Sequence, residues 1–364
     1  MALRCGIVGL PNVGKSTLFN ALSDAGAESA NYPFCTIDPN VGIVSVPDQR
    51  LLTIAALAGS AKTVPTTMEF VDIAGLVAGA SKGEGLGNQF LGHIREVDAL
   101  IHVVRCFTDD NVVHVSGEVD PESDIEVIET ELMLKDLETI EKRIERTTKA
   151  ARGGDKKMKE ELVFYERLRD HIAAGKVVRS MTIQDHEEEW LASLFMLSFK
   201  PVLYAANVGE DDLQAGNDYV EVVRRIAEKE GAEVVIVSAE LEAQMAELPE
   251  EDRKGFLEDM GIHRSGLERL ILAAYKLLKL ETFFTAGPKE ARAWPISVGT
   301  KAPVAAGTIH SDFQRGFIRA ETIKFNDFVR FEGEVGARGA GAMRSEGKEY
   351  TVMDGDVLLF RFNV

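Results

Sequence analysis

The sequence predicts an α/β protein built on a parallel sheet, with a long helical insertion and a small α+β domain after it. Short apolar runs alternate with helical patterns over the first 280 residues, which is typical of a parallel sheet covered on both faces. The strand signal disappears between about residues 123 and 200 and returns in shorter runs past residue 281. We therefore expect two domains, residues 1–280 and residues 281–364, with the insertion inside the first.

Length, composition and charge limit what the chain can be. It has 364 residues, of which 45% are apolar and 27% charged, so more than one globular core is expected. No long uncharged apolar run and no apolar leader occurs, which predicts a cytoplasmic protein without a membrane partner. The net charge of −18 argues against general coating of nucleic acid and against recognition of DNA sequences, but it allows a local basic patch. The scattered cysteines, Cys5, Cys35 and Cys106, are expected to be reduced packing residues.

The first domain should begin with a strand, a loop and a helix. The strand is expected at residues 4–10, and apolar residues at helical spacing follow over residues 16–25. Further strand-like runs lie at residues 67–72, 99–104, 201–206 and 233–237.

Residues 123–200 carry apolar side chains three or four positions apart, with one step of five, which indicates a helix face. The pattern breaks at Gly153 and Gly154 and then resumes, so the insertion should fold back as an antiparallel, coiled-coil helical hairpin. A basic cluster marks its tip: Lys149, Arg152, Lys156, Lys157 and Lys159. These charges either form a docking site or are simply solvated.

Past residue 281 the runs are short and are separated by Gly, Pro and Asp. Strands are expected at residues 282–285, 292–296, 317–320 and 357–362, with one helix near residues 303–313. This pattern indicates a small α+β module.

The loop after the first strand carries a phosphate-binding motif. Residues 9–17 read GLPNVGKST and match G-x-x-x-x-G-K-[ST] between a strand and a helix, where the mechanism requires it. The glycines let backbone N–H groups point inward, and the helix N-terminus adds positive potential. Lys15 should neutralise the β- and γ-phosphate oxygens, and Ser16 should offer its hydroxyl to Mg²⁺. The nucleotide-binding residues expected here are Asn12, Val13, Gly14, Lys15, Ser16 and Thr17.

A second motif is also typical of a site that binds Mg²⁺ and a γ-phosphate. Residues 71–75 read VDIAG, so a strand ends in D-x-x-G. Asp72 should reach Mg²⁺ through water, and the backbone N–H of Gly75 should meet the γ-phosphate. Residues 31–37, NYPFCTI, lie where a switch loop is expected, with Thr36 as a further Mg²⁺ ligand. Together the motifs predict a P-loop NTPase with a G domain.

These motifs, together with residues 283–287, FFTAG, resemble the YchF subfamily of Obg-like NTPases of the TRAFAC class over nearly the whole chain. The resemblance implies a G domain with a helical coiled-coil insertion and a C-terminal β-grasp (TGS) domain. It also implies a translation-associated factor that contacts the ribosome or ribosomal RNA and hydrolyses ATP in preference to GTP.

The residues expected at the base favour ATP. Guanine-specific relatives end a strand with N-K-x-D, whereas residues 207–210 here read NVGE. Glu210 is one methylene longer than Asp, and Val208 lacks the Lys stem that would cover the base. Asn207 could donate to adenine N7 and accept from its 6-amino group, while Ser238 and Ala239 should back the base with main-chain groups. A GTPase or a dual-specificity NTPase is the alternative.

The group that activates water is less evident. Leu76 stands where related enzymes use Gln, so hydrolysis must use another group. His114, in a polar loop after a strand, is the candidate, because an imidazole can accept a proton near neutral pH. Asn12 is the residue type that in related NTPases helps hold K⁺, a candidate second cation. A binding module with incidental hydrolysis is the competing hypothesis, and a P-loop kinase is disfavoured because Arg-rich lid segments are lacking.

Overall fold

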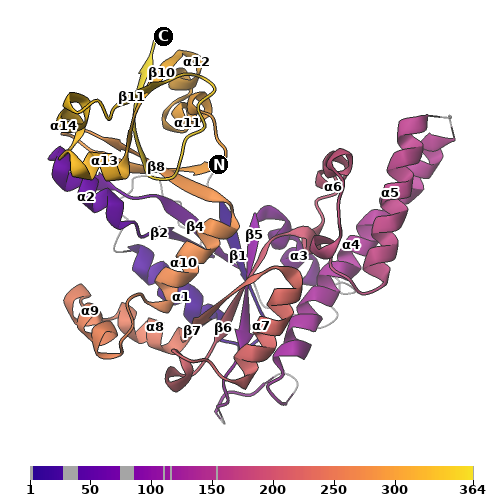
Figure 1. Cartoon of the computed structure of the whole chain (residues 1–364). Helices are drawn as coiled ribbons and strands as arrows, with labels where there is room; N and C mark the ends of the chain where they lie inside the picture. Colours follow the sequence, from indigo (N-terminus) through magenta and orange to yellow (C-terminus); the bar gives the residue numbers. More distant parts are fainter. Residues whose placement is uncertain are drawn as a thin grey trace. The chain divides into compact units, whose positions relative to one another are not determined.

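The computed structural model describes residues 3–27, 40–73, 86–109, 111–114, 117–152 and 155–363. The chain forms two compact units (Figure 1). The first consists of Met1–Ile43 and Glu69–Ala273, and the second of Val44–Met68 and Ala274–Val364.

A parallel sheet forms the core of the first unit, as predicted. Its strands are β1 (Arg4–Val8), β2 (Val41–Ser45), β4 (Thr67–Asp72), β5 (Ala99–Arg105), β6 (Val202–Asn207) and β7 (Glu233–Val237). Their order is β2-β4-β1-β5-β6-β7, and the pairs from β4 to β7 are parallel. Every residue of β5 and β6 is buried, as expected for central strands covered on both faces.

Helices connect these strands, and local sequence explains where they begin and end. The helices of this part are α1 (Lys15–Ala27), α3 (Leu86–Glu96), α7 (Asp218–Glu230), α8 (Ala239–Ala246), α9 (Glu250–Asp259) and α10 (Gly266–Leu277). In α7 the Asn217 side chain accepts a hydrogen bond from the Val220 backbone N–H and caps the first turn. Gly231 ends the helix at φ +66°, a conformation that glycine adopts without strain.

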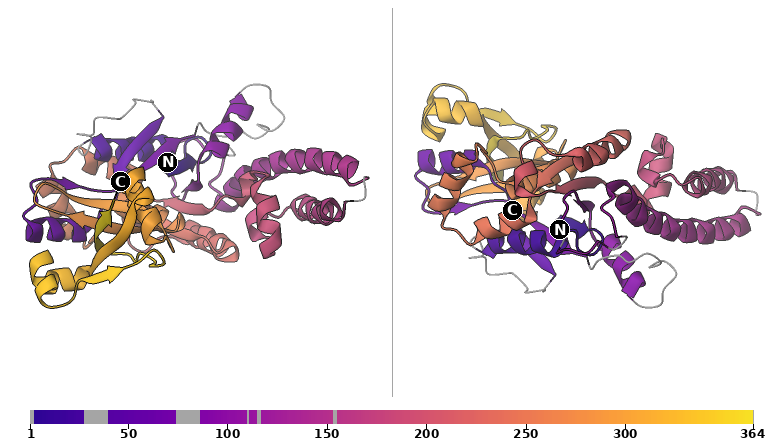
Figure 2. Two further views of the ribbon diagram at one scale, coloured as in Figure 1. Left: turned by 90° about the horizontal axis from the view of Figure 1, so that it is seen from above. Right: turned by 90° about the horizontal axis from the view of Figure 1, so that it is seen from below.

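The insertion begins as the predicted helical hairpin. Helices α4 (Pro121–Ala151) and α5 (Lys156–Ala173) run side by side in every view (Figures 1 and 2). Asp120 caps α4 by accepting from the Glu122 and Ser123 backbone N–H groups. The apolar spacing read from the sequence therefore gave the correct pairing.

The last part of the insertion is not a long helix. After α5 the chain makes short turns: η1 (Val178–Ser180), η2 (Asp185–Glu187), α6 (Glu188–Ala192) and η3 (Leu197–Phe199). Trp190 and Leu191 of this return segment pack into the same core as Tyr165 and Leu168 of α5. The buried Asp136 carboxylate of α4 accepts from the Leu197 and Ser198 backbone N–H groups at 2.7 and 2.8 Å. The return segment is therefore fixed by packing and by a buried carboxylate, which periodicity does not reveal.

The second unit is the expected α+β module. Its strands are β3 (Thr63–Val64), β8 (Leu280–Ala286), β9 (Ala291–Ser297), β10 (Phe317–Lys324), β11 (Arg344–Glu346) and β12 (Asp356–Phe362), in the order β11-β10-β12-β8-β9-β3. Its helices are α2 (Gln49–Ala58), α11 (Ala302–Ile309), α12 (Ser311–Arg315), α13 (Phe325–Arg330) and α14 (Glu334–Gly339). The single helix expected near residues 303–313 is thus two consecutive helices, α11 and α12.

Residues 44–68 belong to this second unit, although the sequence analysis grouped them with residues 1–280. Helix α2 supplies Leu51 and Ile54 to a core that also holds Phe284 and Phe328. The contact joins segments more than two hundred positions apart in the chain, so local sequence patterns do not predict it.

In the described residues no helix is both long enough and apolar enough to cross a membrane. Cys5 and Cys106 are free thiols, and burial raises the pKa of each to about 12, so both stay protonated near neutral pH.

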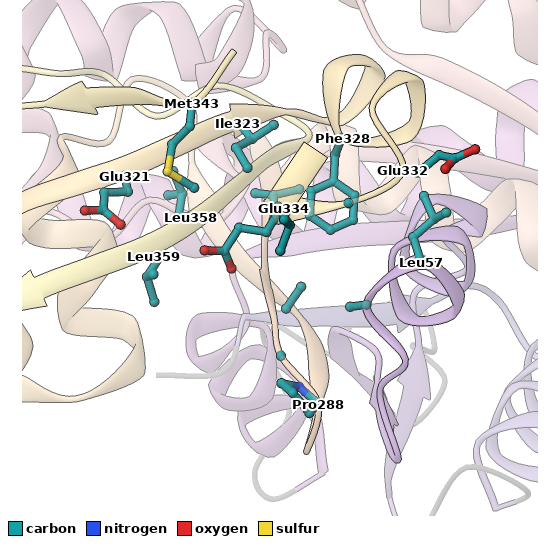
Figure 3. A pocket seen from close by; sticks show the side chains of 16 residues that line it. Leu57, Pro288, Glu321, Ile323, Phe328, Glu332, Glu334, Met343, Leu358 and Leu359 are labelled. Carbon is teal, nitrogen blue, oxygen red and sulfur yellow. The ribbon is translucent and has the colours of Figure 1, made fainter. Parts of the chain in front are cut away.

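The second unit also contains a cavity of about 240 Å³ (Figure 3). Its lining is mainly apolar and includes Ile323, Phe328 and Met343, with carboxylates from Glu321 and Glu334. None of the residues predicted to bind nucleotide or metal lines this cavity.

Candidate nucleotide site

The predicted site residues lie at the carboxyl ends of neighbouring parallel strands. The phosphate-binding loop follows β1, Asp72 ends β4, and Asn207 ends β6. In parallel sheets these ends lie at one edge, which is where ligands bind. The sheet therefore brings together residues that are far apart in sequence.

The phosphate-binding loop has the backbone that its glycines suggest. Gly14 has φ +89°, and a Cβ at this position would overlap the amide nitrogen of Asn207. Asn12 also adopts a left-handed conformation, with φ +63°. Helix α1 begins at Lys15, and the Leu18 backbone N–H donates to the Gly14 carbonyl at 3.0 Å. The N-terminus of α1 thus follows the loop directly, as an anion site requires.

Lys15 and Asp72 join the two sequence motifs into one site. The Lys15 ammonium forms an ion pair with the Asp72 carboxylate, although the residues are 57 positions apart. Lys15 is only 8% exposed, and the Asp72 side chain is 19% exposed. A cation in such a place interacts strongly with the charge of a phosphate because little water screens it.

Ser16, the predicted metal ligand of this loop, directly follows Lys15 in the sequence. Ser16 and Thr17 occupy the first turn of α1 and are exposed. Hydroxyl and carboxylate oxygens are the ligands that Mg²⁺ prefers, so Ser16 and Asp72 fit that ion. Thr36 and Gly75, together with Leu76, lie outside the described residues and stay predictions.

Asn207 holds the loop in place. Its side-chain nitrogen donates to the Val13 carbonyl at 2.9 Å, and its oxygen accepts from the Ala239 backbone N–H at 2.9 Å. The residue is 3% exposed. The sequence predicts this amide at the edge of the base, whereas in the structure it joins the phosphate-binding loop to the start of α8. This positioning role depends on the contact between the end of β6 and the phosphate-binding loop, which the sequence alone does not show.

The other residues expected near the base sit at the same edge. Val208 is 2% exposed, and its backbone N–H donates to the Val237 carbonyl at 2.9 Å. Ser238 is 3% exposed and precedes α8. Glu210 is exposed at the start of η4 (Glu210–Asp212). The Val208 side chain therefore belongs to the core, and the Glu210 carboxylate is the more accessible of the two.

The loop after β5 is held by a buried arginine that the sequence analysis missed. Arg105 is 1% exposed, and its guanidinium donates to the carbonyls of Phe107 and Val112 at 3.1 and 3.0 Å. It also lies 4.6 Å from the centre of the Phe107 ring. Arg105 ends a strand whose other residues are apolar except His102, and this was the available signal, because a buried arginine must find acceptors.

His114 lies in this loop, which contacts the phosphate-binding loop through the neighbouring residue. The Asn12 side-chain nitrogen donates to the carbonyl of Val113, the preceding residue, at 3.1 Å. His114 itself is 6% exposed, and its Nε2 atom lies 3.0 Å from an Asp124 carboxylate oxygen. His114 is therefore not a solvated loop residue. Asp124, in the first turn of α4, was not anticipated.

Comparisons with known proteins match both units. The family model YchF-GTPase_C, described as a protein of unknown function, matches residues 280–363, and the model described as a 50S ribosome-binding GTPase matches residues 4–148. Proteins named ribosome-binding ATPase YchF from Escherichia coli O157:H7 and Bacillus subtilis strain 168 are each 56% identical to the chain, with both sequences covered completely. The solved YchF GTPase of Schizosaccharomyces pombe is 37% identical, with a TM-score of 0.90, and the match covers 99% of this chain and 97% of that chain.

Proposed function

Since the chain belongs to the YchF family, we propose that it is a ribosome-associated ATPase that prefers ATP to GTP and acts as a nucleotide-dependent switch in translation. Nucleotide hydrolysis follows from the family and its P-loop domain. The single observation that carries the proposal is the buried Lys15 ammonium, paired with the Asp72 carboxylate beside the phosphate-binding loop. A ribosome-bound enzyme works in the cytoplasm, which is the location we propose.

Mg²⁺ is the cofactor that the site chemistry fits. Ser16 and Asp72 would hold the ion, and Thr36 would add a ligand from the segment before β2. When bound, Mg²⁺ neutralises charge on the phosphate oxygens. K⁺ is proposed as a second cation at Asn12, whose amide nitrogen donates to the Val113 carbonyl and whose amide oxygen is a suitable ligand for a cation.

His114 is proposed to accept the proton of the attacking water. Asn12 of the phosphate-binding loop donates a hydrogen bond to the loop that contains His114. Leu76 offers no polar atom that could orient the attacking water. In this proposal three residues of the chain have separate roles. Lys15 stabilises the negative charge of the phosphates, the Gly75 N–H donates to the γ-phosphate, and His114 accepts the proton.

The preference for ATP rests on the residues that replace the guanine-reading motif. The buried Val208 side chain cannot extend over a base as a Lys stem does, and Glu210 is longer than the Asp that pairs with guanine. A carboxylate facing adenine would meet an acceptor and would gain nothing. The names of the relatives differ on this point, since the bacterial proteins are called ATPases and the yeast protein a GTPase. Competitive calorimetry of ATP and GTP decides it, and stronger GTP binding would overturn the assignment.

Shortening the carboxylate should recover part of the affinity for guanine. We expect Glu210→Asp to strengthen GTP binding by about tenfold, the equivalent of one charge-assisted hydrogen bond of about 1.5 kcal/mol. ATP binding should change little. The matched control is Glu210→Gln, which removes the charge at nearly constant size and should not strengthen GTP binding. If both variants bind GTP as the wild type does, Glu210 does not face the base.

The tip of the helical hairpin is the surface that we propose contacts ribosomal RNA. Arg152, Lys157 and Lys159 are exposed, and within the described residues they form no ion pair. Lys149 and Lys156 are exposed as well, although each has a glutamate partner one helical turn away. A cluster of cations on a chain of net charge −18 is complementary to a phosphate backbone.

Neutralising the tip should weaken ribosome binding and reduce its dependence on salt. For the variant Arg152→Gln/Lys157→Gln/Lys159→Gln, we expect the slope of log affinity against log salt to fall by about 0.7–0.9 for each phosphate that the tip no longer neutralises. Sedimentation with purified ribosomes at several salt concentrations measures this. The control, Lys142→Gln/Arg169→Gln/Lys176→Gln, makes the same change in net charge elsewhere on the insertion and should keep the wild-type slope. Equal slopes for both variants would show that the tip does not contact RNA.

A further inference from the structure

Two residues of the phosphate-binding loop, Asn12 and Gly14, have left-handed backbones, with φ +63° and +89°. Left-handed residues within a turn can point successive backbone N–H groups toward one side, which makes a concave anion site. Glycine adopts this conformation freely, whereas any residue with a side chain adopts it at a cost, asparagine less than most. The shape of the anion site therefore depends on what holds Asn12 in place.

The Asn12 side chain contacts the loop that follows β5. Its amide nitrogen donates to the Val113 carbonyl at 3.1 Å. The Val113 side chain is 75% exposed, so packing of that side chain does not fix the carbonyl. The position of the carbonyl depends instead on the backbone before it and on His114 after it, whose imidazole contacts Asp124.

The backbone before Val113 closes around the guanidinium of Arg105, a residue that is 1% exposed. The three guanidinium nitrogens donate to three backbone carbonyls at 3.0 to 3.4 Å: those of Phe107, Asp109 and Val112. Because the donors of a guanidinium lie in one fixed plane, this single side chain sets the relative positions of three peptide groups. The Val112 carbonyl that Arg105 binds directly precedes the Val113 carbonyl that Asn12 binds.

The start of the same loop is bonded to the parallel sheet. The Cys106 backbone N–H donates to the Asn207 carbonyl at 2.8 Å, and the Cys106 carbonyl accepts from the Asn217 side chain at 2.8 Å. Asn207 is the residue whose side chain donates to Val13 of the phosphate-binding loop. The loop after β5 and the phosphate-binding loop are thus attached to the same strand end, at β6.

We propose that Arg105 is a positioning residue for nucleotide binding, although it lies outside the phosphate-binding loop. By fixing the loop after β5 it places the Val113 carbonyl, and this carbonyl holds Asn12 in the left-handed conformation. The anion site is then formed before the phosphates arrive, so binding does not have to order it. The inference rests on the proposed nucleotide site, and it concerns binding rather than the chemical step.

The test measures the affinity for ADP by calorimetry, with Mg²⁺ and Na⁺ present and K⁺ left out, so that neither hydrolysis nor the proposed K⁺ site contributes. Arg105→Met removes the guanidinium. Asn12→Gly removes the amide but keeps the left-handed conformation accessible. We expect each variant to bind ADP about three- to tenfold more weakly, the usual effect of losing one hydrogen bond. Because both substitutions break the same connection, the double variant should bind no more weakly than the weaker single variant.

Two further variants separate positioning from general stability. Arg179→Met is the matched control, because Arg179 is also a buried arginine of the first unit but pairs with Glu129 and Glu230. It should leave the ADP affinity of the folded protein unchanged. Asn12→Ala should bind ADP more weakly than Asn12→Gly, because alanine disfavours a left-handed backbone. Asn12 is exposed, so its two variants test the connection even where Arg105→Met does not fold.

Each outcome assigns the failure to one idea. If the wild type does not bind ADP, the proposed nucleotide site fails and the inference fails with it. If the wild type binds ADP and Arg105→Met binds it equally well, the site stands but the contact between His114 and Asp124, not Arg105, holds the loop. If the two losses multiply in the double variant, or if Asn12→Gly and Asn12→Ala both bind ADP as the wild type does, the positioning role of Arg105 through Asn12 is overturned.

Discussion

Replacing Lys15 with alanine is expected to reduce single-turnover ATP hydrolysis by about 10²–10³-fold, the usual effect of removing one preorganised group that stabilises transition-state charge. Lys15 is 8% exposed and its ammonium lies against the Asp72 carboxylate, so water neither screens it nor replaces it well. Binding of ATP should weaken as well, because the β- and γ-phosphates lose their nearest cation.

The measurement requires binding and chemistry to be separated. Calorimetry gives the affinity for ATP, and rapid quenching at saturating protein gives the rate of the chemical step. Lys62→Ala, at an exposed lysine of the second unit, is the matched control and should behave as the wild type. Intact affinity together with an intact rate in Lys15→Ala would overturn the entire interpretation of the nucleotide site.

The parts of this site that the sequence predicted are those that follow from local rules. A phosphate-binding loop needs glycines, a lysine and a helix start within a few residues, so residues 9–17 were recognisable without any tertiary information. The end of β4 placed Asp72 in the same way. Parallel strands then bring their carboxyl ends together, and the Lys15–Asp72 pair is the consequence.

The parts that the sequence did not predict depend on contacts between distant segments. Nothing near Asp124 indicates that it faces His114, because their pairing requires both the loop after β5 and the first turn of α4. The role of Asn207 in holding Val13 likewise appears only when β6 lies beside the loop. Helix α2 joins the second unit because its apolar face completes a core with Phe284, which is far away in the chain.

A buried ion cluster connects the base of the insertion to the parallel sheet. Arg179, in η1, pairs with Glu129 of α4 and with Glu230 at the end of α7, the latter at 2.9 Å. Glu230 also accepts a hydrogen bond from the Tyr204 hydroxyl of β6 at 2.9 Å. Arg179 and its two glutamates are each at most 15% exposed at the side chain.

Arg179→Met is expected to lower the free energy of unfolding by about 3–5 kcal/mol, because it leaves the buried Glu230 carboxylate, and the ionised fraction of Glu129, without their cation. Chemical denaturation at neutral pH measures this. The control Arg169→Met removes an exposed arginine of α5 and should leave the unfolding midpoint nearly unchanged. If the destabilisation comes from uncompensated charge, adding Glu129→Gln and Glu230→Gln to Arg179→Met should restore much of the stability. No recovery would instead assign the destabilisation to packing.

The same cluster predicts how stability depends on pH. Burial and the nearby Glu230 raise the pKa of Glu129 above its ordinary value of 4.5, although Arg179 acts in the opposite direction. The folded protein therefore keeps a proton on Glu129 at pH values where the unfolded chain has released it. The contribution of that proton is complete below pH 4.5 and is lost as the pH rises through the folded-state pKa. Relative to Glu129→Gln, the wild type should lose stability as the pH rises from 4.5 towards neutrality. If the unfolding free energies of the two proteins instead change with pH in parallel, Glu129 stays ionised in the fold.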